Sequence, residues 1–179
     1  MNRRSNIYLI GPMGSGKTAV GRQLALSTGR EFLDSDQEIE RRTGVDIAYI
    51  FEKEGESGFR ARECEVIEDL TRRDCIVLAT GGGAVLAESN RKRLAETGVV
   101  IHLDTTVEEQ LKRTKRSQTR PLLLNDDPRA VLEKLRSQRQ PLYEALADYS
   151  LDTTGRRVKT VAASITHILE NDSRVALQT

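Results

Sequence analysis

Short runs of apolar and β-branched residues recur along the chain and are separated by helical patterns of apolar and polar positions. Five runs predict strands, at residues 7–10, 31–33, 76–79, 99–103 and 149–151. Strands that alternate with helices are typical of a parallel sheet with helices on both faces. The pattern therefore predicts an α/β fold of three layers, with the sheet in the middle.

Capping residues mark where the helices begin and end. Ser, Thr or Asp begins a helix by accepting a hydrogen bond from an early backbone N–H, and glycine ends one by adopting the left-handed conformation. The expected starts are Ser35 with Glu38, Thr106 with Glu109, and Asp127 before Pro128. The expected ends are Gly29, Gly44, Gly55 and Gly98.

Two regions depart from the alternation of strands and helices. Residues 36–73 predict successive helices broken at Gly44 and Gly55, and residues 112–128 are polar and basic. Segments inserted into such folds often select the substrate or close over it. We therefore expect a helical substrate-binding region over about residues 34–62 and a mobile lid over about residues 112–128.

The first predicted strand leads directly into a glycine-rich loop. Residues 11–18 read G-x-x-x-x-G-K-T, and helical spacing follows from Lys17. Glycines let such a loop turn its N–H groups inward around phosphate oxygens, and the helix adds the positive end of its dipole. Lys17 is expected to reach the β- and γ-phosphates of a nucleotide, and Thr18 to supply a hydroxyl ligand to Mg²⁺. The alternative is a glycine-rich turn without a ligand.

Two carboxylates follow the second predicted strand. Asp34 and Asp36 lie at its carboxyl end, which in a doubly wound sheet faces the same crevice as the phosphate-binding loop. Asp34 is the better candidate for holding Mg²⁺ through its waters, whereas Asp36 can accept hydrogen bonds from an acceptor hydroxyl and remove its proton. Alternatively, Asp36 only supplies negative charge to a helix N-terminus, and the two roles can coexist.

An arginine and three glycines are further candidates for binding the acceptor. Arg60 projects from a different side of its helix than the set Phe59, Glu63, Val66, Ile67 and Leu70. Its guanidinium can clamp a carboxylate, although a single helical arginine, Arg60 or Arg139, is more often an exposed surface group. Residues 80–83, Thr-Gly-Gly-Gly, permit close approach of a ligand to the backbone, and an ordinary flexible loop is the alternative.

Length, charge and composition narrow the possible functions. At 179 residues with 37% hydrophobic content, the chain suits a single domain over residues 1–179, and its net charge of +1 gives no long-range field that favours nucleic acid or a membrane. Cys64 and Cys75 match no common zinc or redox spacing. With no signal-peptide core and no apolar run of membrane length, we expect a cytoplasmic protein that binds neither nucleic acid nor membrane. A monomer is the default expectation.

Six motifs occur along the chain in a recognisable order. They are the phosphate-binding loop, Asp34-Ser-Asp36, Gly58-Phe-Arg60, Ala79-Thr-Gly81-Gly-Gly83, Arg120-Pro-Leu-Leu123 and Arg139-Gln-Pro-Leu-Tyr143. Together they make nearly the whole chain resemble the shikimate kinase family. The resemblance implies the P-loop kinase fold, similar to that of nucleoside monophosphate kinases, with a five-stranded parallel sheet in the order 2-3-1-4-5.

The resemblance also implies an activity and a set of site residues. The activity is ATP-dependent phosphorylation of the 3-hydroxyl of shikimate, with Mg²⁺, to give shikimate 3-phosphate and ADP in the biosynthesis of chorismate and the aromatic amino acids. The implied ATP-binding residues are Gly14, Ser15, Gly16, Lys17, Thr18, Ala19, Arg113, Arg120 and Arg157. The implied shikimate-binding residues are Asp36, Arg60, Gly82 and Arg139. The implied metal-binding residues are Thr18 and Asp34, and the implied catalytic residues are Lys17, Asp36 and Arg120.

Individual roles follow from the same resemblance. Arg60 and Arg139 would hold the shikimate carboxylate, Asp36 would hold its hydroxyls and act as general base, and Gly82 would contribute a backbone N–H. Arg120, in the lid, would stabilise the transferring phosphoryl group beside Lys17. Arg113 would stack on adenine, and residues 152–157 would cover the other side of the base. Phe51 and Phe59 match aromatic residues near the substrate ring, although each is equally compatible with the core.

Three rival functions remain open at this point. A kinase of gluconate or of a nucleoside monophosphate would keep the phosphate-binding loop and change the acceptor site. A GTP-driven switch is suggested only by Asp152-Thr-Thr-Gly155, which lies after the last strand, and the chain has no N-K-x-D guanine motif. A nucleic-acid-dependent ATPase would show a wider basic surface or stacking aromatic residues.

Overall fold

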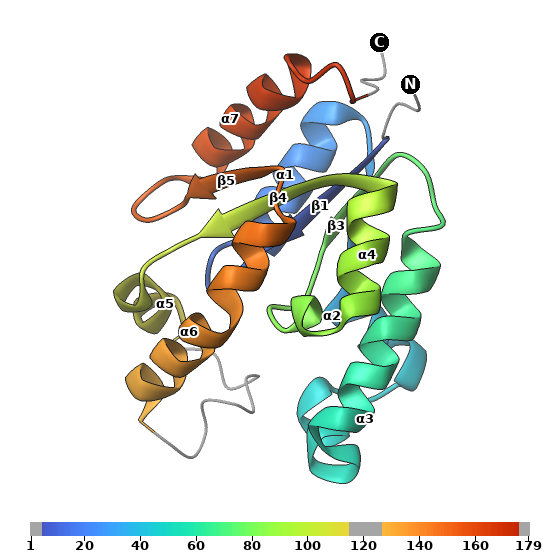
Figure 1. Ribbon diagram of the computed structural model, residues 1–179, viewed down its shortest axis with the longest axis vertical. Coiled ribbons are helices and arrows are strands. Elements are labelled where there is room, and N and C mark those ends of the chain that lie inside the picture. Colours follow the sequence, from blue (N-terminus) through green and yellow to red (C-terminus); the bar gives the residue numbers. More distant parts are fainter. Residues whose placement is uncertain (1–4, 115–126, 176–179) are drawn as a thin grey trace.

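The computed structural model describes residues 5–114 and 127–175, which form alternating strands and helices (Figure 1). The strands are β1 (Asn6–Ile10), β2 (Glu31–Asp34), β3 (Ile76–Ala79), β4 (Gly98–Asp104) and β5 (Tyr149–Asp152). The helices are α1 (Lys17–Thr28), α2 (Ser35–Thr43), α3 (Ile47–Leu70), α4 (Glu88–Thr97), α5 (Val107–Thr114), α6 (Pro128–Leu146) and α7 (Val158–Glu170), with a 3₁₀ turn, η1 (Ala84–Leu86). All five predicted strands are therefore confirmed.

The five strands form one parallel sheet in the order β2-β3-β1-β4-β5. β1 lies in the centre, where Ile7 pairs with Val77 of β3 and with Val99 of β4. The first, third and fourth strands are almost wholly buried, as expected for strands covered on both faces. The predicted three-layer fold and strand order are confirmed.

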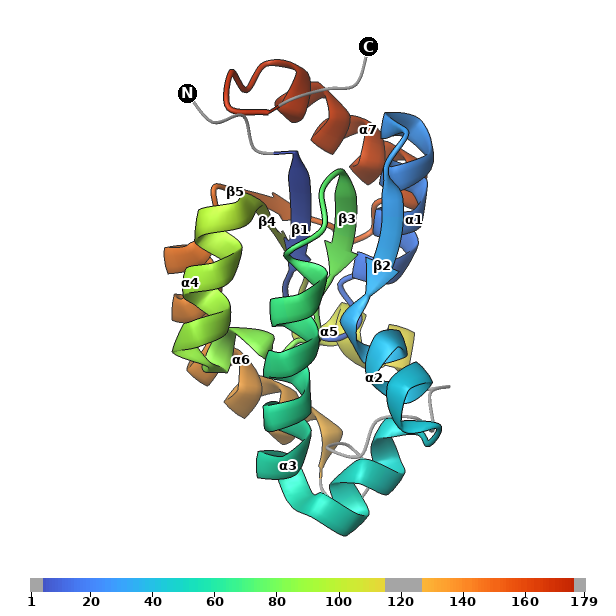
Figure 2. The ribbon, with the colours of Figure 1, turned by 90° about the vertical axis from the view of Figure 1, so that its right-hand side faces the viewer.

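Alternate residues of β1 enter different cores on the two faces of the sheet. Ile7 and Leu9 belong to the core beneath α1 and α7, whereas Tyr8 and Ile10 belong to the core beneath α3, α4 and α6. Figure 2 shows α1 and α7 on one side of the sheet and α4 on the other. Burying each large aliphatic side chain contributes roughly 1.5–3 kcal/mol, so these two cores hold the central strand in place.

Three predicted helix boundaries differ in detail from the structure. Ser35 was expected to cap α2, but the cap is Asp34, whose carboxylate accepts hydrogen bonds from the N–H groups of Asp36 (3.0 Å) and Gln37 (3.3 Å). Glu38 does not reach back to a cap, because its carboxylate binds Arg41 and Arg42. β2 therefore passes into α2 without a loop, and this places both Asp34 and Asp36 at the carboxyl edge of the sheet.

The other two differences involve glycines. α3 continues through the expected break at Gly55, where a φ of 70° and ψ of −176° produce a kink. Gly98 follows α4 in an extended conformation and is the first residue of β4. A side chain there would collide with the ring of Tyr8, so close packing against β1 rather than helix termination explains this glycine. The other predicted starts and ends are confirmed.

The carboxyl ends of three neighbouring strands bring the sequence motifs together. β1 leads into the glycine-rich loop, β2 into Asp34 and Asp36, and β3 into residues 80–83. In open parallel sheets this edge is where ligands bind. Most of the predicted lid, together with Arg120, lies outside the described residues. Within the residues described, no helix is long and apolar enough to cross a membrane.

Candidate active site

A cleft of about 570 Å³ opens at the carboxyl edge of the sheet. One end is lined by the glycine-rich loop and the first turn of α1, and the other by α3 and the glycines after β3. The lining includes eleven of the site residues that the family resemblance implied, among them Lys17, Asp36, Arg60 and Arg139. The structure therefore joins the predicted phosphate site and the predicted acceptor site in one cavity.

The glycine-rich loop is shaped for an anion. Gly14 and Gly16 have φ values of 77° and 91°, which other residues adopt only with strain, and Gly16 begins α1 without any side-chain cap. The first N–H groups of α1 thus have no capping side chain, and the helix dipole favours negative charge there. These features are what a phosphate group requires.

The side chain of Lys17 lies along the glycine-rich loop. Its ammonium group donates hydrogen bonds to the backbone oxygens of Gly11 (2.8 Å) and Pro12 (2.9 Å). The side chain is mostly buried but lines the cleft. These contacts hold the positive charge beside the loop, where it attracts an anionic phosphate.

Thr18 and Asp34 are in direct contact. The Thr18 hydroxyl donates a 2.7 Å hydrogen bond to Asp34 Oδ2, while Asp34 Oδ1 caps α2. Two hard oxygen atoms are thereby fixed beside the expected phosphate position. Oxygen ligands of this kind fit Mg²⁺, which keeps several waters and needs only one or two contacts from the protein.

Asp36 points into the cleft in an environment that disfavours its negative charge. Its Oδ1 atom is buried and has no hydrogen-bond partner among the described residues. Burial raises the pKa of Asp36 to about 7, and the negative charges of Asp34 and Glu63 add to this, against the opposing effect of Lys17 and Arg60. A carboxylate with a pKa near neutrality is suited to general base catalysis.

Arg60 is fixed by two glutamates of its own helix. Its Nη1 donates to Glu63 Oε2 at 2.7 Å and its Nη2 to Glu56 Oε1 at 3.1 Å. The guanidinium also lies directly against the backbone of Gly83, where a side chain would collide with it. Arg60 is therefore not the ordinary surface arginine that the sequence left open, but a cation that is oriented at the wall of the cleft.

Glu63 is a cleft residue that the sequence did not identify. It lies on the apolar side of α3 and is completely buried, and burial raises its pKa while Arg60 and Arg139 oppose the rise. Its Oε1 atom has no hydrogen-bond partner within the described part of the chain. The sequence did contain a signal for Glu63, because it is a glutamate among the apolar residues on one side of the helix. A carboxylate buried there requires a cationic partner nearby, which indicates a polar site.

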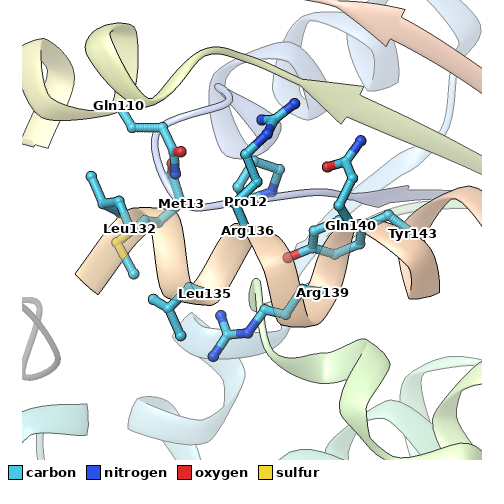
Figure 3. A pocket seen from close by; sticks show the side chains of 9 residues that line it. All are labelled: Pro12, Met13, Gln110, Leu132, Leu135, Arg136, Arg139, Gln140 and Tyr143. Carbon is cyan, nitrogen blue, oxygen red and sulfur yellow. The ribbon is translucent and has the colours of Figure 1, made fainter. Parts of the chain in front are cut away.

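α6 contributes Arg139 and Tyr143 from the opposite wall. Arg139 is buried, and its guanidinium lies near Gly82, where an added Cβ would be 3.6 Å from Nη1. Tyr143 donates its hydroxyl hydrogen to Gly82 O, and burial raises the pKa of Tyr143 to about 12, so the donor stays protonated. Figure 3 shows Arg139 and Tyr143 of α6 among the side chains that line a pocket together with Pro12 and Met13. Gly82, in the Thr-Gly-Gly-Gly segment at residues 80–83, is thus held between α6 and the phosphate-binding loop.

Two aromatic side chains line the acceptor end of the cleft. Phe51 and Phe59 lie on either side of the kink in α3, with ring centroids 4.9 Å apart. Phe59 is buried and packs in the core, whereas Phe51 is only partly buried. Each residue therefore belongs both to the core and to the wall of the cleft.

The predicted adenine end is only partly assembled. Arg113 lines the cleft and donates hydrogen bonds to Gly14 O (2.9 Å) and Thr153 O (3.1 Å). Thr153, in the loop at residues 152–157, is therefore in direct contact with Arg113. Arg157, however, is exposed at the start of α7 and is not among the residues that line the cleft.

Comparisons with known proteins agree with this arrangement. The family model described as shikimate kinase matches residues 13–170. The chain is 54% identical over 170 residues to "Shikimate kinase" of Vibrio campbellii, covering 95% of this chain and 99% of that protein. It is 52% identical over 173 residues to "Shikimate kinase 1" of Escherichia coli, covering 96% and 100%.

Solved structures give the same result. Shikimate kinase from Acinetobacter baumannii in complex with shikimate has a TM-score of 0.92 and 51% identity, with 96% of this chain and 97% of that chain covered. Shikimate kinase from Aquifex aeolicus has a TM-score of 0.80 and 36% identity, covering 92% and 96%. The predicted family and the expected kinase activity are confirmed. The chain belongs to the shikimate kinase family.

Proposed function

We propose that this kinase transfers the γ-phosphoryl group of ATP to the 3-hydroxyl of shikimate, with Asp36 as the general base. The products are shikimate 3-phosphate and ADP, and the reaction belongs to the biosynthesis of chorismate and the aromatic amino acids. The observation that carries the proposal is the position of Asp36. This carboxylate, with a pKa of about 7, lies in one cleft with a phosphate-binding loop and two arginines.

The ATP phosphates bind at the first turn of α1. Backbone N–H groups of residues 14–19 surround them, and Lys17 moves from Gly11 O and Pro12 O onto the β- and γ-phosphates. Arg113 and the loop at residues 152–157 lie at the adenine end, and Arg157 belongs to this loop. Arg120, which lies outside the described residues, completes the charge around the transferring group.

Two oxygen atoms of the protein would hold the Mg²⁺ that accompanies ATP. Thr18 Oγ1 and Asp34 Oδ2, which are 2.7 Å apart, are the protein oxygens that would hold it, Asp34 through water. In the described parts of the chain no three His, Cys, Asp or Glu side chains gather as a metal site. Mg²⁺ commonly keeps several waters and takes phosphate oxygens as ligands, so two protein oxygens would suffice. When bound, the ion neutralises negative charge on the phosphates.

Shikimate occupies the acceptor end. Arg60 and Arg139 hold its carboxylate, the Gly82 N–H donates to it, and Asp36 accepts hydrogen bonds from its hydroxyls. Arg60 is held in place by Glu56 and Glu63, and Gly82 by Tyr143. Because these hydrogen-bond donors are already fixed in place, less entropy is lost when the substrate is bound and oriented.

Phosphoryl transfer then requires one proton acceptor and several fixed cations. Asp36 accepts the proton of the 3-hydroxyl as this oxygen forms a bond to the γ-phosphorus. The bond between the γ-phosphorus and the β,γ-bridging oxygen breaks, and ADP leaves with the electron pair. Lys17 and Arg120 stabilise the charge that spreads over the transferring group.

The organisation and setting of the enzyme are part of the proposal. The chain forms a single domain over residues 1–179, with a substrate-binding region at about residues 34–62 and a lid at about residues 112–128. We propose a monomeric, cytoplasmic enzyme that binds neither nucleic acid nor membrane, in keeping with its net charge of +1. Light scattering after gel filtration tests the monomer, and ATP turnover with added RNA or DNA tests the exclusion of nucleic acid.

The first experiment measures ADP release from Mg-ATP with a panel of acceptors. Shikimate, quinate, gluconate, a nucleoside monophosphate and water alone are compared at equal concentrations. Strong and selective stimulation by shikimate is expected. If gluconate or the nucleoside monophosphate worked and shikimate did not, the phosphate site would stand, but the roles of Asp36, Arg60 and Arg139 would be wrong.

A further inference from the structure

The outer side of the phosphate-binding loop is held by three side chains from other parts of the fold. Gln110 Nε2 donates to Met13 O at 2.7 Å, Arg113 Nη1 to Gly14 O at 2.9 Å, and Thr153 Oγ1 lies 3.0 Å from Ser15 O. Three successive carbonyl oxygens of the loop are therefore each bound by a different side chain. We propose that Gln110, Arg113 and Thr153 are positioning residues that aim the loop N–H groups at the nucleotide phosphates.

The geometry of the peptide bond links each contact to the phosphate site. The described residues contain no cis peptide bond, and in a trans peptide the C=O and the following N–H point in opposite directions. Holding the oxygens of residues 13–15 outward therefore turns the N–H groups of Gly14, Ser15 and Gly16 the other way. Ser15 N–H closes a turn with Pro12 O at 3.3 Å, so the N–H groups left to bind phosphate are those of Gly14 and Gly16, which line the cleft.

Two of the three residues approach the loop from the side away from the cleft. Gln110 and Thr153 are each 2% exposed and do not line the cleft, whereas Arg113 does. Figure 3 shows Gln110 reaching from α5 to Met13. Gly14 and Gly16 have positive φ values, and glycine can adopt many backbone conformations. Without these contacts the loop would sample several conformations when no nucleotide is bound, and binding would cost more entropy.

Two elements are joined to the loop by these contacts. Gln110 and Arg113 are neighbours on one face of α5, and α5 packs so closely on Gly14 that an added Cβ would lie 3.3 Å from Gln110 Cα. Thr153 is itself anchored to the sheet, because its backbone N–H donates to Asp104 O at the end of β4 at 2.9 Å. The loop is thereby fixed to the sheet and to α5 at the same time.

Arg113 keeps its expected contact with adenine under this proposal. Its hydrogen bonds to Gly14 O, Thr153 O and Glu109 use the edge of the guanidinium group. The flat face is the part that stacks on an aromatic base, so both roles are compatible. Thr153 and Gln110 are the better test residues. Thr153 belongs to the proposed adenine loop, but its hydroxyl is directed to Ser15 O, and neither residue lines the cleft.

The test compares ligands with and without phosphates. The inference rests on the proposed binding of nucleotide phosphates by this loop, so ADP, adenosine and shikimate are titrated separately, with Mg²⁺ constant. Thr153→Val should raise the Kd for ADP about five- to tenfold, the effect of losing one buried hydrogen bond, and leave the Kd values of adenosine and shikimate unchanged. Thr153→Ser, which retains the hydroxyl, should restore ADP binding.

A matched variant controls for the loss of a buried hydroxyl. Thr71 is also buried and donates to Ile67 O at 2.7 Å, but at the end of α3, so Thr71→Val should leave all three affinities unchanged. Gln110→Met removes the donor to Met13 O and provides the same test if Thr153→Val does not give folded protein by circular dichroism. In steady-state assays both variants should raise KM for ATP and leave KM for shikimate unchanged.

The outcomes separate this inference from the proposed function. Unchanged ADP affinity in folded Thr153→Val and Gln110→Met overturns the positioning role, as does a parallel loss of adenosine binding. Wild-type protein that binds ADP but shows no turnover with shikimate would instead overturn the proposed function. Loss of ADP affinity alone, with rescue by Thr153→Ser, supports the positioning role.

Discussion

Asp36 and Glu63 share the space above the α-carbon of Gly81. A Cβ added to Gly81 would lie 2.8 Å from Asp36 Oδ1 and 2.6 Å from Glu63 Oε1, and neither oxygen has a hydrogen-bond partner among the described residues. Two carboxylates this close cannot both ionise without cost. The pair therefore links the proposed general base to a residue of α3 that also holds Arg60.

Glu63→Gln should move the pH dependence of the enzyme toward lower pH. The base must be ionised to act, so kcat/KM for shikimate falls as pH drops through the pKa of Asp36, which is about 7. Removing the charge of Glu63 removes one cause of the raised pKa and leaves Arg60 to favour the ionised form. The acidic limb of the pH profile measures the shift.

Glu56→Gln is the matched control for this change. Glu56 also binds Arg60, but it is half exposed and is not among the groups that shift the pKa of Asp36. Its profile should keep the wild-type acidic limb. If Glu63→Gln also kept that limb, the coupling between the two carboxylates would be refuted.

Asp36→Asn should stabilise the protein near neutral pH while it abolishes turnover. The folded-state pKa of about 7 lies above the unfolded value of about 3.9, so the folded state holds this proton more tightly. Stability from this group is therefore lost as pH rises from about 4 to 7, and Asn avoids the loss. Thermal melts at pH 8 should show a Tm higher by a few degrees, with little difference at pH 4.

One result of the thermal melts would contradict the raised pKa of Asp36. An Asp36→Asn variant that melted below wild type at pH 8 would show that the ionised carboxylate stabilises the fold. The raised pKa would then be wrong, and so would the reason for choosing Asp36 as the base. Circular dichroism at both pH values confirms that the compared proteins are folded.

The sheet and the phosphate-binding loop could be predicted because their signals are local. Ile7 to Lys17 contain both the buried strand and the glycines with positive φ, and each residue type has a direct structural meaning. The cap of α2 was misassigned by one residue, because both Asp34 and Ser35 are good caps. Only the three-dimensional position of β2 decides between them.

Contacts between residues far apart in the chain could not be predicted from the sequence. Gln110 binds a carbonyl group 97 residues away, and Thr153 binds one 138 residues away. Nothing in the residues around either position indicates such a role. Glu63 did carry a local indication, since a charged residue on the apolar side of α3 must find a buried partner. The partner, Arg60, lay three residues before it.

Lys17→Ala should remove most of the catalytic rate without unfolding the enzyme. Its ammonium group is held beside the glycine-rich loop by Gly11 O and Pro12 O, and losing such an electrostatic contact lowers kcat by about 10²–10³-fold. ADP release at saturating shikimate measures the effect. Lys159→Ala, on the exposed start of α7, is the control and should be indistinguishable from wild type. Near-normal turnover in Lys17→Ala would rule out the proposed phosphate site.

Arg60→Ala should mainly weaken shikimate binding. Removing one partner of a buried charge pair costs about 2–5 kcal/mol, so KM for shikimate should rise at least about thirtyfold, with a smaller change in KM for ATP. Arg62→Ala is the matched control, because Arg62 lies on the same helix in an exposed ion pair with Glu54. Exposed pairs contribute little, so its kinetics should equal those of wild type. An unchanged KM for shikimate in Arg60→Ala would exclude Arg60 from the acceptor site, and the carboxylate would then have to be held by Arg139 alone.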